Sequence, residues 1–265
     1  AGADIIETNT FSAQRISMDD YHAGHFCREI NLAATAIARS VADEYTLRNP
    51  GKPRMVAGSV GPTNKTCSLS PDVNNPALRN LTFDELASAY EEQMVALLEG
   101  GVDMFLIETI FDTLNAKAAL FAAENAMRTM QRRVPIMLSV TLSDKAGRTL
   151  SGQTLEAFLA SVRHADIFSV GLNCSFGARD MKPFIERLAK IAPYYISAYP
   201  NAGLPNAMGQ YDQTPGDMAV QVKEFIDEGL VNIIGGCCGT TDEYIAQYDA
   251  LIRNDDGSWK APHVP

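Results

Sequence analysis

The sequence predicts an α/β fold, a (β/α)8 barrel of the TIM type that lacks its first strand and helix. Short aliphatic runs alternate with longer amphipathic stretches along the whole chain, and no Ser/Pro-rich linker divides it. Seven strand–helix pairs within 265 residues favour a barrel over an open, doubly wound sheet. The open sheet would normally carry a glycine-rich phosphate-binding turn after its first strand, whereas here that strand runs into Glu7–Phe11, which contains no glycine.

The expected strands are short and apolar on both faces, which is typical of parallel strands covered by helices. They are predicted at Asp4–Glu7, Met55–Val60, Met104–Glu108, Ile136–Thr141, Ile167–Leu172, Tyr194–Ala198 and Val231–Ile234. A closed barrel of this type needs eight strands. Because residue 1 comes directly before the first of the seven, we expect the opening strand and helix of the barrel to be absent.

The amphipathic stretches between the strands predict seven helices, at about Asp19–Arg48, Phe83–Glu99, Thr113–Met130, Thr154–Arg163, Asp180–Lys190, Pro215–Asp227 and Asp242–Arg253. The second has the clearest ends, because Thr82 and Glu85 form a capping box and Gly100-Gly101 follows its last turn. We expect residues 1–254 to form one domain and residues 255–265 to begin a linker.

The composition argues against several classes of function. The net charge is −10, and the 22 Lys and Arg residues are spread along the chain, so a nucleic-acid partner is not expected. No apolar run approaches the roughly 18 residues that a membrane span needs. The five cysteines are odd in number and no export signal precedes them, which favours a reducing, cytoplasmic compartment over a disulfide scaffold.

Three of the cysteines follow predicted strands. Cys237 and Cys238 are adjacent and flanked by glycines, and Cys174 ends the strand before Ser175. In a barrel these strand ends face one another across the mouth, and three protein ligands with one open position are typical of a catalytic zinc site. Two other interpretations stay open: Cys174 as a small core residue, and Cys237 with Cys238 as a vicinal disulfide or redox switch.

The remaining cysteines and the histidines predict no site. Cys27 falls within a helical run and Cys67 within a polar loop, so ordinary packing or surface positions are expected for both. His22 and His25 stand three residues apart on a predicted helix, where a solvated face is expected.

Two carboxylates, Glu7 and Glu108, also stand at predicted strand ends. They either hold a substrate ammonium group or form a structural salt bridge at the barrel rim. The polar loops Gly61–Asn80, Gly147–Gln153 and Pro200–Asn206 are expected at the same rim, where enzymes of this fold carry their function.

The two cysteine segments, Gly171–Cys174 and Gly235–Thr241, resemble those of the homocysteine S-methyltransferase domain. That family includes betaine- and S-methylmethionine-dependent enzymes and the first module of cobalamin-dependent methionine synthase. Longer segments are similar to the last of these, namely Ala3–Phe11, Gly61–Asn64, Ser70–Asn74, Ile107–Lys117, Ser151–Thr154 and Pro200–Asn206. The resemblance covers essentially the whole chain.

The resemblance implies a zinc ion held by Cys174, Cys237 and Cys238, with the sulfur of homocysteine at the fourth position. It also implies that Glu108, Asn9, Asn173 and Asn201 lie near this substrate. The methyl donor would be methylcobalamin, presented by a cobalamin-binding module of the same full-length chain, which also carries a folate-binding module. The product would be methionine.

The chemistry agrees with this expectation, because a free thiol has a pKa near 8.5 and zinc binding deprotonates it. Two alternatives remain at the level of the sequence. One is a stand-alone homocysteine methyltransferase that uses S-methylmethionine or betaine, and the other is a non-catalytic redox or binding protein that uses the adjacent cysteines.

Overall fold

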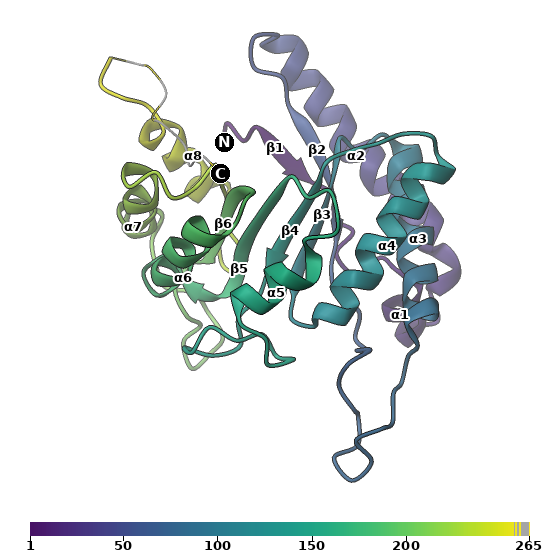
Figure 1. Ribbon diagram of the computed structural model, residues 1–265. Coiled ribbons are helices and arrows are strands. Elements are labelled where there is room, and N and C mark those ends of the chain that lie inside the picture. Colours follow the sequence, from purple (N-terminus) through teal and green to yellow (C-terminus); the bar gives the residue numbers. More distant parts are fainter. Residues whose placement is uncertain (257, 259, 261–264) are drawn as a thin grey trace.

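The computed structural model of the chain describes residues 1–256, 258, 260 and 265. Its centre is one sheet of seven strands in the order β1-β2-β3-β4-β5-β6-β7, and every neighbouring pair is parallel. The sheet curls into a half-barrel, with helices following the strands in alternation (Figure 1). The predicted fold class is confirmed: this is the (β/α)8 arrangement with part of its wall missing.

All seven predicted strands are present: β1 (Ile5–Glu7), β2 (Met55–Val60), β3 (Met104–Ile110), β4 (Ile136–Val140), β5 (Ser169–Gly177), β6 (Tyr195–Asn201) and β7 (Ile233–Ile234). The largest difference from the prediction is in β5, which does not stop at Leu172 but continues to Gly177. Its pairing with β6 shifts register between Asn173 and Gly177. This bulge interrupts the apolar pattern from which the strand was predicted.

The helices are α1 (Arg15–Met18), α2 (Cys27–Arg48), α3 (Phe83–Gly100), α4 (Thr113–Thr129), α5 (Leu155–Val162), α6 (Ala178–Ile191), α7 (Pro215–Asp227) and α8 (Asp242–Leu251), with two 3-10 turns, η1 (Asp19–Tyr21) and η2 (Gly24–Phe26). The predicted helix Asp19–Arg48 is wrong in its first part. Its regular portion begins at Cys27, because His22 takes a left-handed conformation (φ 55°) that interrupts the helix. The predicted capping box of α3 is confirmed.

The interior of the half-barrel changes from apolar to polar along the strands. Ala57, Met104, Leu106 and Met137 pack together with Tyr199 on the inner face. Since alternate residues of a strand share a face, the positions two residues after Ala57, Leu106 and Met137 also point inward. Those positions hold Ser59, Glu108 and Ser139. The polar end is therefore the carboxyl end of the strands.

The loops that leave this end include the three that the sequence predicted at the rim, after β2, β4 and β6. Figure 1 shows them at one end of the sheet, with the loop between β2 and α3 extending furthest. Within the part of the chain that the structure describes, no helix is long and apolar enough to cross a membrane. Residues 257, 259 and 261–264 of the predicted linker, His263 among them, lie outside the described residues, so the predicted domain boundary stays a prediction.

Candidate metal centre

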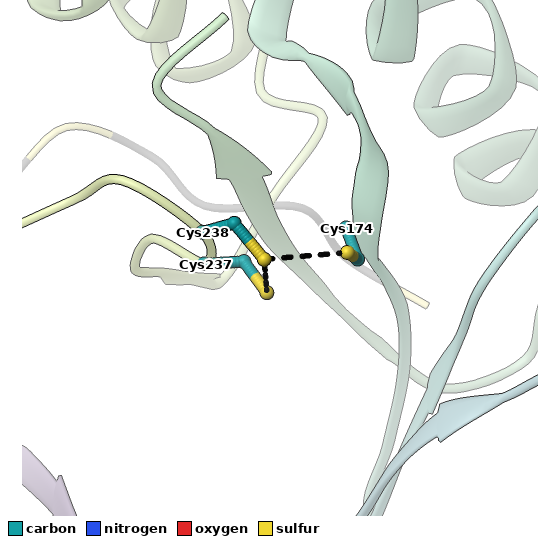
Figure 2. A group of neighbouring side chains, drawn as sticks. All are labelled: Cys174, Cys237 and Cys238. Atoms are coloured by element: carbon teal, nitrogen blue, oxygen red, sulfur yellow. Dashed lines mark hydrogen bonds between the residues drawn. The ribbon is translucent and has the colours of Figure 1, made fainter. Parts of the chain in front are cut away.

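Three cysteine sulfurs meet at the carboxyl end of the sheet. Cys174 comes from β5, and Cys237 and Cys238 come from the loop after β7 (Figure 2). The Sγ atoms of Cys174 and Cys238 are 3.6 Å apart, and those of Cys237 and Cys238 are 3.9 Å apart. All three sulfurs lie within 4.8 Å of one another, and no second group of His, Cys, Asp and Glu side chains converges in this way among the described residues.

These separations fit a tetrahedral metal ion. Zinc binds cysteine sulfur at about 2.3 Å, so two sulfurs on a tetrahedral zinc stand roughly 3.8 Å apart. The two measured separations lie on either side of that value. A disulfide needs about 2.05 Å, and all five cysteines are free. The donor set therefore suits a soft ion with three thiolates bound and one position open.

The loop that carries Cys237 and Cys238 is shaped by glycines and held by the end of β6. A Cβ on Gly239 (φ 79°) would fall 2.3 Å from Cγ of Tyr211, so only glycine fits there. The backbone N–H of Cys237 donates to the carbonyl oxygen of Pro200 at 2.9 Å. The N–H of Cys238 donates to Oδ1 of Asn201 at 3.1 Å.

The third sulfur is placed by the bulge of β5. Cys174 has φ 63° and Ser175 has φ 61°, a conformation that residues other than glycine rarely adopt. These two left-handed residues turn the Cys174 side chain toward the loop after β7 (Figure 2). Asn173, directly before them, is buried and hydrogen-bonds to Thr109, Ser139 and Cys237.

The three thiols of the cluster shift one another's pKa values in opposite directions. A hydrogen bond from Cys237 lowers the pKa of the Cys174 thiol to about 5. The same bond raises the pKa of Cys237, and burial raises the pKa of Cys238. A thiolate at Cys174 shared with two neighbouring thiols is a ready ligand for a cation.

The two predicted carboxylates lie at the same end of the sheet. Glu108 is half-buried, and Oε1 accepts a hydrogen bond of 2.5 Å from the hydroxyl of Ser59 on β2. Burial raises the pKa of Glu108. Glu7 is in contact with solvent, yet desolvation by the surrounding protein atoms and then the charge of Glu108 raise its pKa to about 8. Neither carboxylate joins an ion pair with any described residue, so the salt bridge considered from the sequence is not formed.

Other residues singled out in the sequence lie apart from the cluster. Asn9 is exposed in the loop after β1 and, among the described residues, makes no hydrogen bond to the cysteines. Cys27 and Cys67 are buried, and their thiols donate to the carbonyl oxygens of Ala13 and Thr82, as expected of packing residues. His22 and His25 belong to no convergent ligand group in the described chain.

Two residues at the site were not found from the sequence. Ser59 could have been found, because it is a polar residue within the apolar run of β2 and lies two positions after the inward-facing Ala57. Tyr211 could not. Its hydroxyl hydrogen-bonds to Cys238, and only the folding of the β6–α7 loop over the cysteines brings the two together.

Comparisons with solved structures agree with the fold. The homocysteine methyltransferase MmuM from Escherichia coli is similar at TM-score 0.73 in its oxidized and metallated forms and 0.68 in its apo form. Each match has 20% identity and covers 94% of this chain and 80% of that one. An amine oxidase, HisD from Pseudomonas geniculata, is similar at TM-score 0.53, with 12% identity over 84% of this chain and 39% of its own. At such identities these structures share the fold alone.

A match of another kind covers nearly the whole chain. The family model described as homocysteine S-methyltransferase matches residues 1–252, a span that contains all three cysteines of the cluster and both carboxylates. This chain therefore belongs to the homocysteine S-methyltransferase family.

Proposed function

We propose that this chain is a zinc-dependent module that activates the thiol of homocysteine for methyl transfer from methylcobalamin, giving methionine. The observation that carries the proposal is the sulfur triad of Cys174, Cys237 and Cys238, which is spaced for a tetrahedral ion and leaves its fourth position open at the rim. Membership of the family supports homocysteine as the substrate.

A zinc ion bound by three thiolates lowers the pKa of a fourth, substrate thiol, so that its sulfur is a nucleophile at neutral pH. The chain supplies the ligands from two segments, β5 and the loop after β7. Asn201 and Pro200 hold that loop through its backbone N–H groups, which keeps Cys238 aimed at Cys174. The three cysteine thiolates would outweigh the charge of the ion that they hold, and they would therefore keep a substrate sulfur at the fourth position electron-rich.

The amino group of homocysteine is bound, in this proposal, by the carboxylate of Glu108. Ser59 fixes that carboxylate by donating to Oε1, and no described cation neutralises it, so it is available to a substrate ammonium. Asn201 accepts from the backbone N–H of Cys238 and Asn173 donates to the sulfur of Cys237, so both act on the same substrate by holding the cysteines in place. Asn9, exposed on the neighbouring loop, stays a predicted contact.

Methylcobalamin as donor rests on the segments that resemble cobalamin-dependent methionine synthase, such as Ser70–Asn74 and Pro200–Asn206. Ser70–Asn74 lies in the loop after β2, and Pro200–Asn206 spans the end of β6 and the start of the loop that follows it. Cobalamin- and folate-binding modules of one full-length chain are the partners that follow. The free state of all five cysteines supports a reducing, cytoplasmic setting.

The ligand assignment is tested by metal analysis of the purified chain. We expect about one zinc per chain in the wild type and none retained after dialysis in Cys174→Ala, Cys237→Ala or Cys238→Ala, because two sulfurs hold zinc too weakly. Cys67→Ala is the matched control, since it removes a buried thiol away from the cluster, and it should keep its zinc. Full zinc in Cys238→Ala would disprove the assignment.

A second candidate is a stand-alone homocysteine methyltransferase that uses a small methyl donor. It is favoured by the similarity to MmuM, which spans 80% of that chain. The two candidates differ in what drives methionine formation from homocysteine. Formation with added methylcobalamin supports the first, and formation from S-methylmethionine or betaine without any corrinoid supports the second.

A further inference from the structure

Asn173 is a side chain whose hydrogen-bonding capacity is completely used within the protein. It is 1% exposed. Its Oδ1 accepts from the backbone N–H of Thr109 at 3.0 Å and from the hydroxyl of Ser139 at 2.7 Å. Its Nδ2 donates to Oγ1 of Thr109 at 2.9 Å and to Sγ of Cys237 at 3.7 Å. An asparagine side chain has two acceptor and two donor positions, so none remains for a substrate.

Two of these bonds hold the strand that carries Glu108. Thr109 has φ 55°, a left-handed conformation that is rare for a β-branched residue, and the pairing of β3 with β4 shifts register here. The amide of Asn173 bonds both the backbone and the side chain of Thr109 in this conformation. Because Glu108 directly precedes Thr109, the direction of its carboxylate depends on these two hydrogen bonds.

The remaining bonds reach the sulfur cluster and the neighbouring strand. Nδ2 contacts the sulfur of Cys237, and Asn173 precedes Cys174 in the bulge of β5. Ser139, on β4 between the two bulged strands, supports Oδ1. One buried amide thus ties the carboxylate at one side of the site to the sulfurs at the other.

We propose that Asn173 is a positioning residue that sets the separation between Glu108 and the sulfur cluster, and that this separation selects homocysteine over cysteine. The inference rests on the proposed function. The two amino acids differ by one methylene between the ammonium group and the sulfur. If Glu108 and the sulfur cluster stand at a fixed separation, cysteine is too short to reach both. A misplacement of about 1 Å is enough to weaken binding and reaction strongly.

The test is a calorimetric titration of the zinc-loaded chain with L-homocysteine and with L-cysteine, combined with zinc analysis. The wild type should prefer homocysteine. In Asn173→Ala we expect that preference to fall at least tenfold while about one zinc per chain remains, because all three sulfur ligands are still present. Ser139→Ala leaves the asparagine in place and removes only its support, so it should move the preference in the same direction by a smaller factor.

Asn31→Ala is the matched control, because Asn31 is another fully buried amide that donates to two backbone carbonyls, in α2. It should lower the midpoint of unfolding without changing the preference, which separates positioning from a general loss of stability. Wild-type preference in both Asn173→Ala and Ser139→Ala would overturn this proposal and leave the proposed function standing. A zinc-loaded wild type that binds no L-homocysteine would overturn both.

Discussion

Glu7 is a carboxylate at the site whose pKa departs strongly from its ordinary value. Its pKa is raised from 4.5 to about 8, first by desolvation and then by the charge of Glu108. Between these two values the folded chain keeps a proton that the unfolded chain has released. The free energy of unfolding therefore falls as the pH rises through this interval, and the loss is complete only above the raised pKa.

Replacing Glu7 by Gln removes this dependence, because the amide cannot ionise. We expect Glu7→Gln to be more stable than the wild type near pH 8 and to differ from it least near pH 4.5, the two ends of the interval. Urea unfolding of both proteins at the two pH values measures the difference. An equal difference at both would mean that Glu7 titrates like any exposed carboxylate.

At the scale of residues, the cysteines could be predicted and their surroundings could not. Adjacent cysteines between glycines, together with a cysteine at a strand end, predict from local sequence that three sulfurs converge, and the structure brings them within 4.8 Å of one another. Ser59 and Tyr211 matter because of contacts with Glu108 and Cys238 that only the folded chain creates. No pattern along the sequence encodes such pairs.

At the scale of elements, the loop after β7 determines whether the sulfurs meet. Gly239 and Gly209 both have a left-handed φ, 79° and 77°, but only at Gly239 would a Cβ collide with a neighbour, the ring of Tyr211. An alanine at Gly209 would add only backbone strain, whereas an alanine at Gly239 would add backbone strain and a steric clash.

We expect Gly239→Ala to lose most of its zinc, because the collision displaces Cys238 from the cluster. Gly209→Ala should keep its zinc and lose only about 1 kcal/mol of stability, the usual order of cost of a left-handed alanine. Zinc analysis and urea unfolding of both variants measure these effects. Zinc retained equally by the two would show that the loop accommodates a Cβ at Gly239 without moving the sulfurs.

The boundaries of helices were predictable where capping residues mark them, as in α3 and α7. The prediction of boundaries failed where a residue takes a left-handed φ. The predicted helix ran through His22, whereas the left-handed φ of His22 interrupts it in the structure. The predicted strand stopped at Leu172, whereas β5 continues to Gly177. Hydrophobic periodicity records which face a residue presents and carries no information on a single left-handed φ.

At the scale of the whole molecule, the sheet has two edges where a closed barrel has none. β1 pairs only with β2 and β7 only with β6, and no strand in the described ranges joins β7 to β1. The strand order was predictable, because the alternation of strands and helices leaves few other arrangements. The conformation of the edge strands β1 and β7 could not be predicted in the same way, because it depends on contacts with segments that are distant in the sequence.

The open edges should be the least protected part of the sheet. We expect amides of β1 and β7 to exchange hydrogen faster than those of β4, which is buried along its whole length and paired on both sides. Hydrogen exchange with peptide-level mass spectrometry measures the order. Protection of β1 equal to that of β4 would show that another segment or molecule covers the edge in solution.

A metal ion held by the sulfur cluster would also make the lifetime of the folded chain depend on the supply of that ion. Cys174 and Cys238 stand 64 residues apart, and β6, α6, α7 and β7 all lie between them. An ion that binds only when both segments are in place stabilises the folded state by about 2.7 kcal/mol once its free concentration reaches a hundred times its dissociation constant. Scarcity of the ion would then shorten the lifetime of the chain against proteases, since the C-terminal third would open more often.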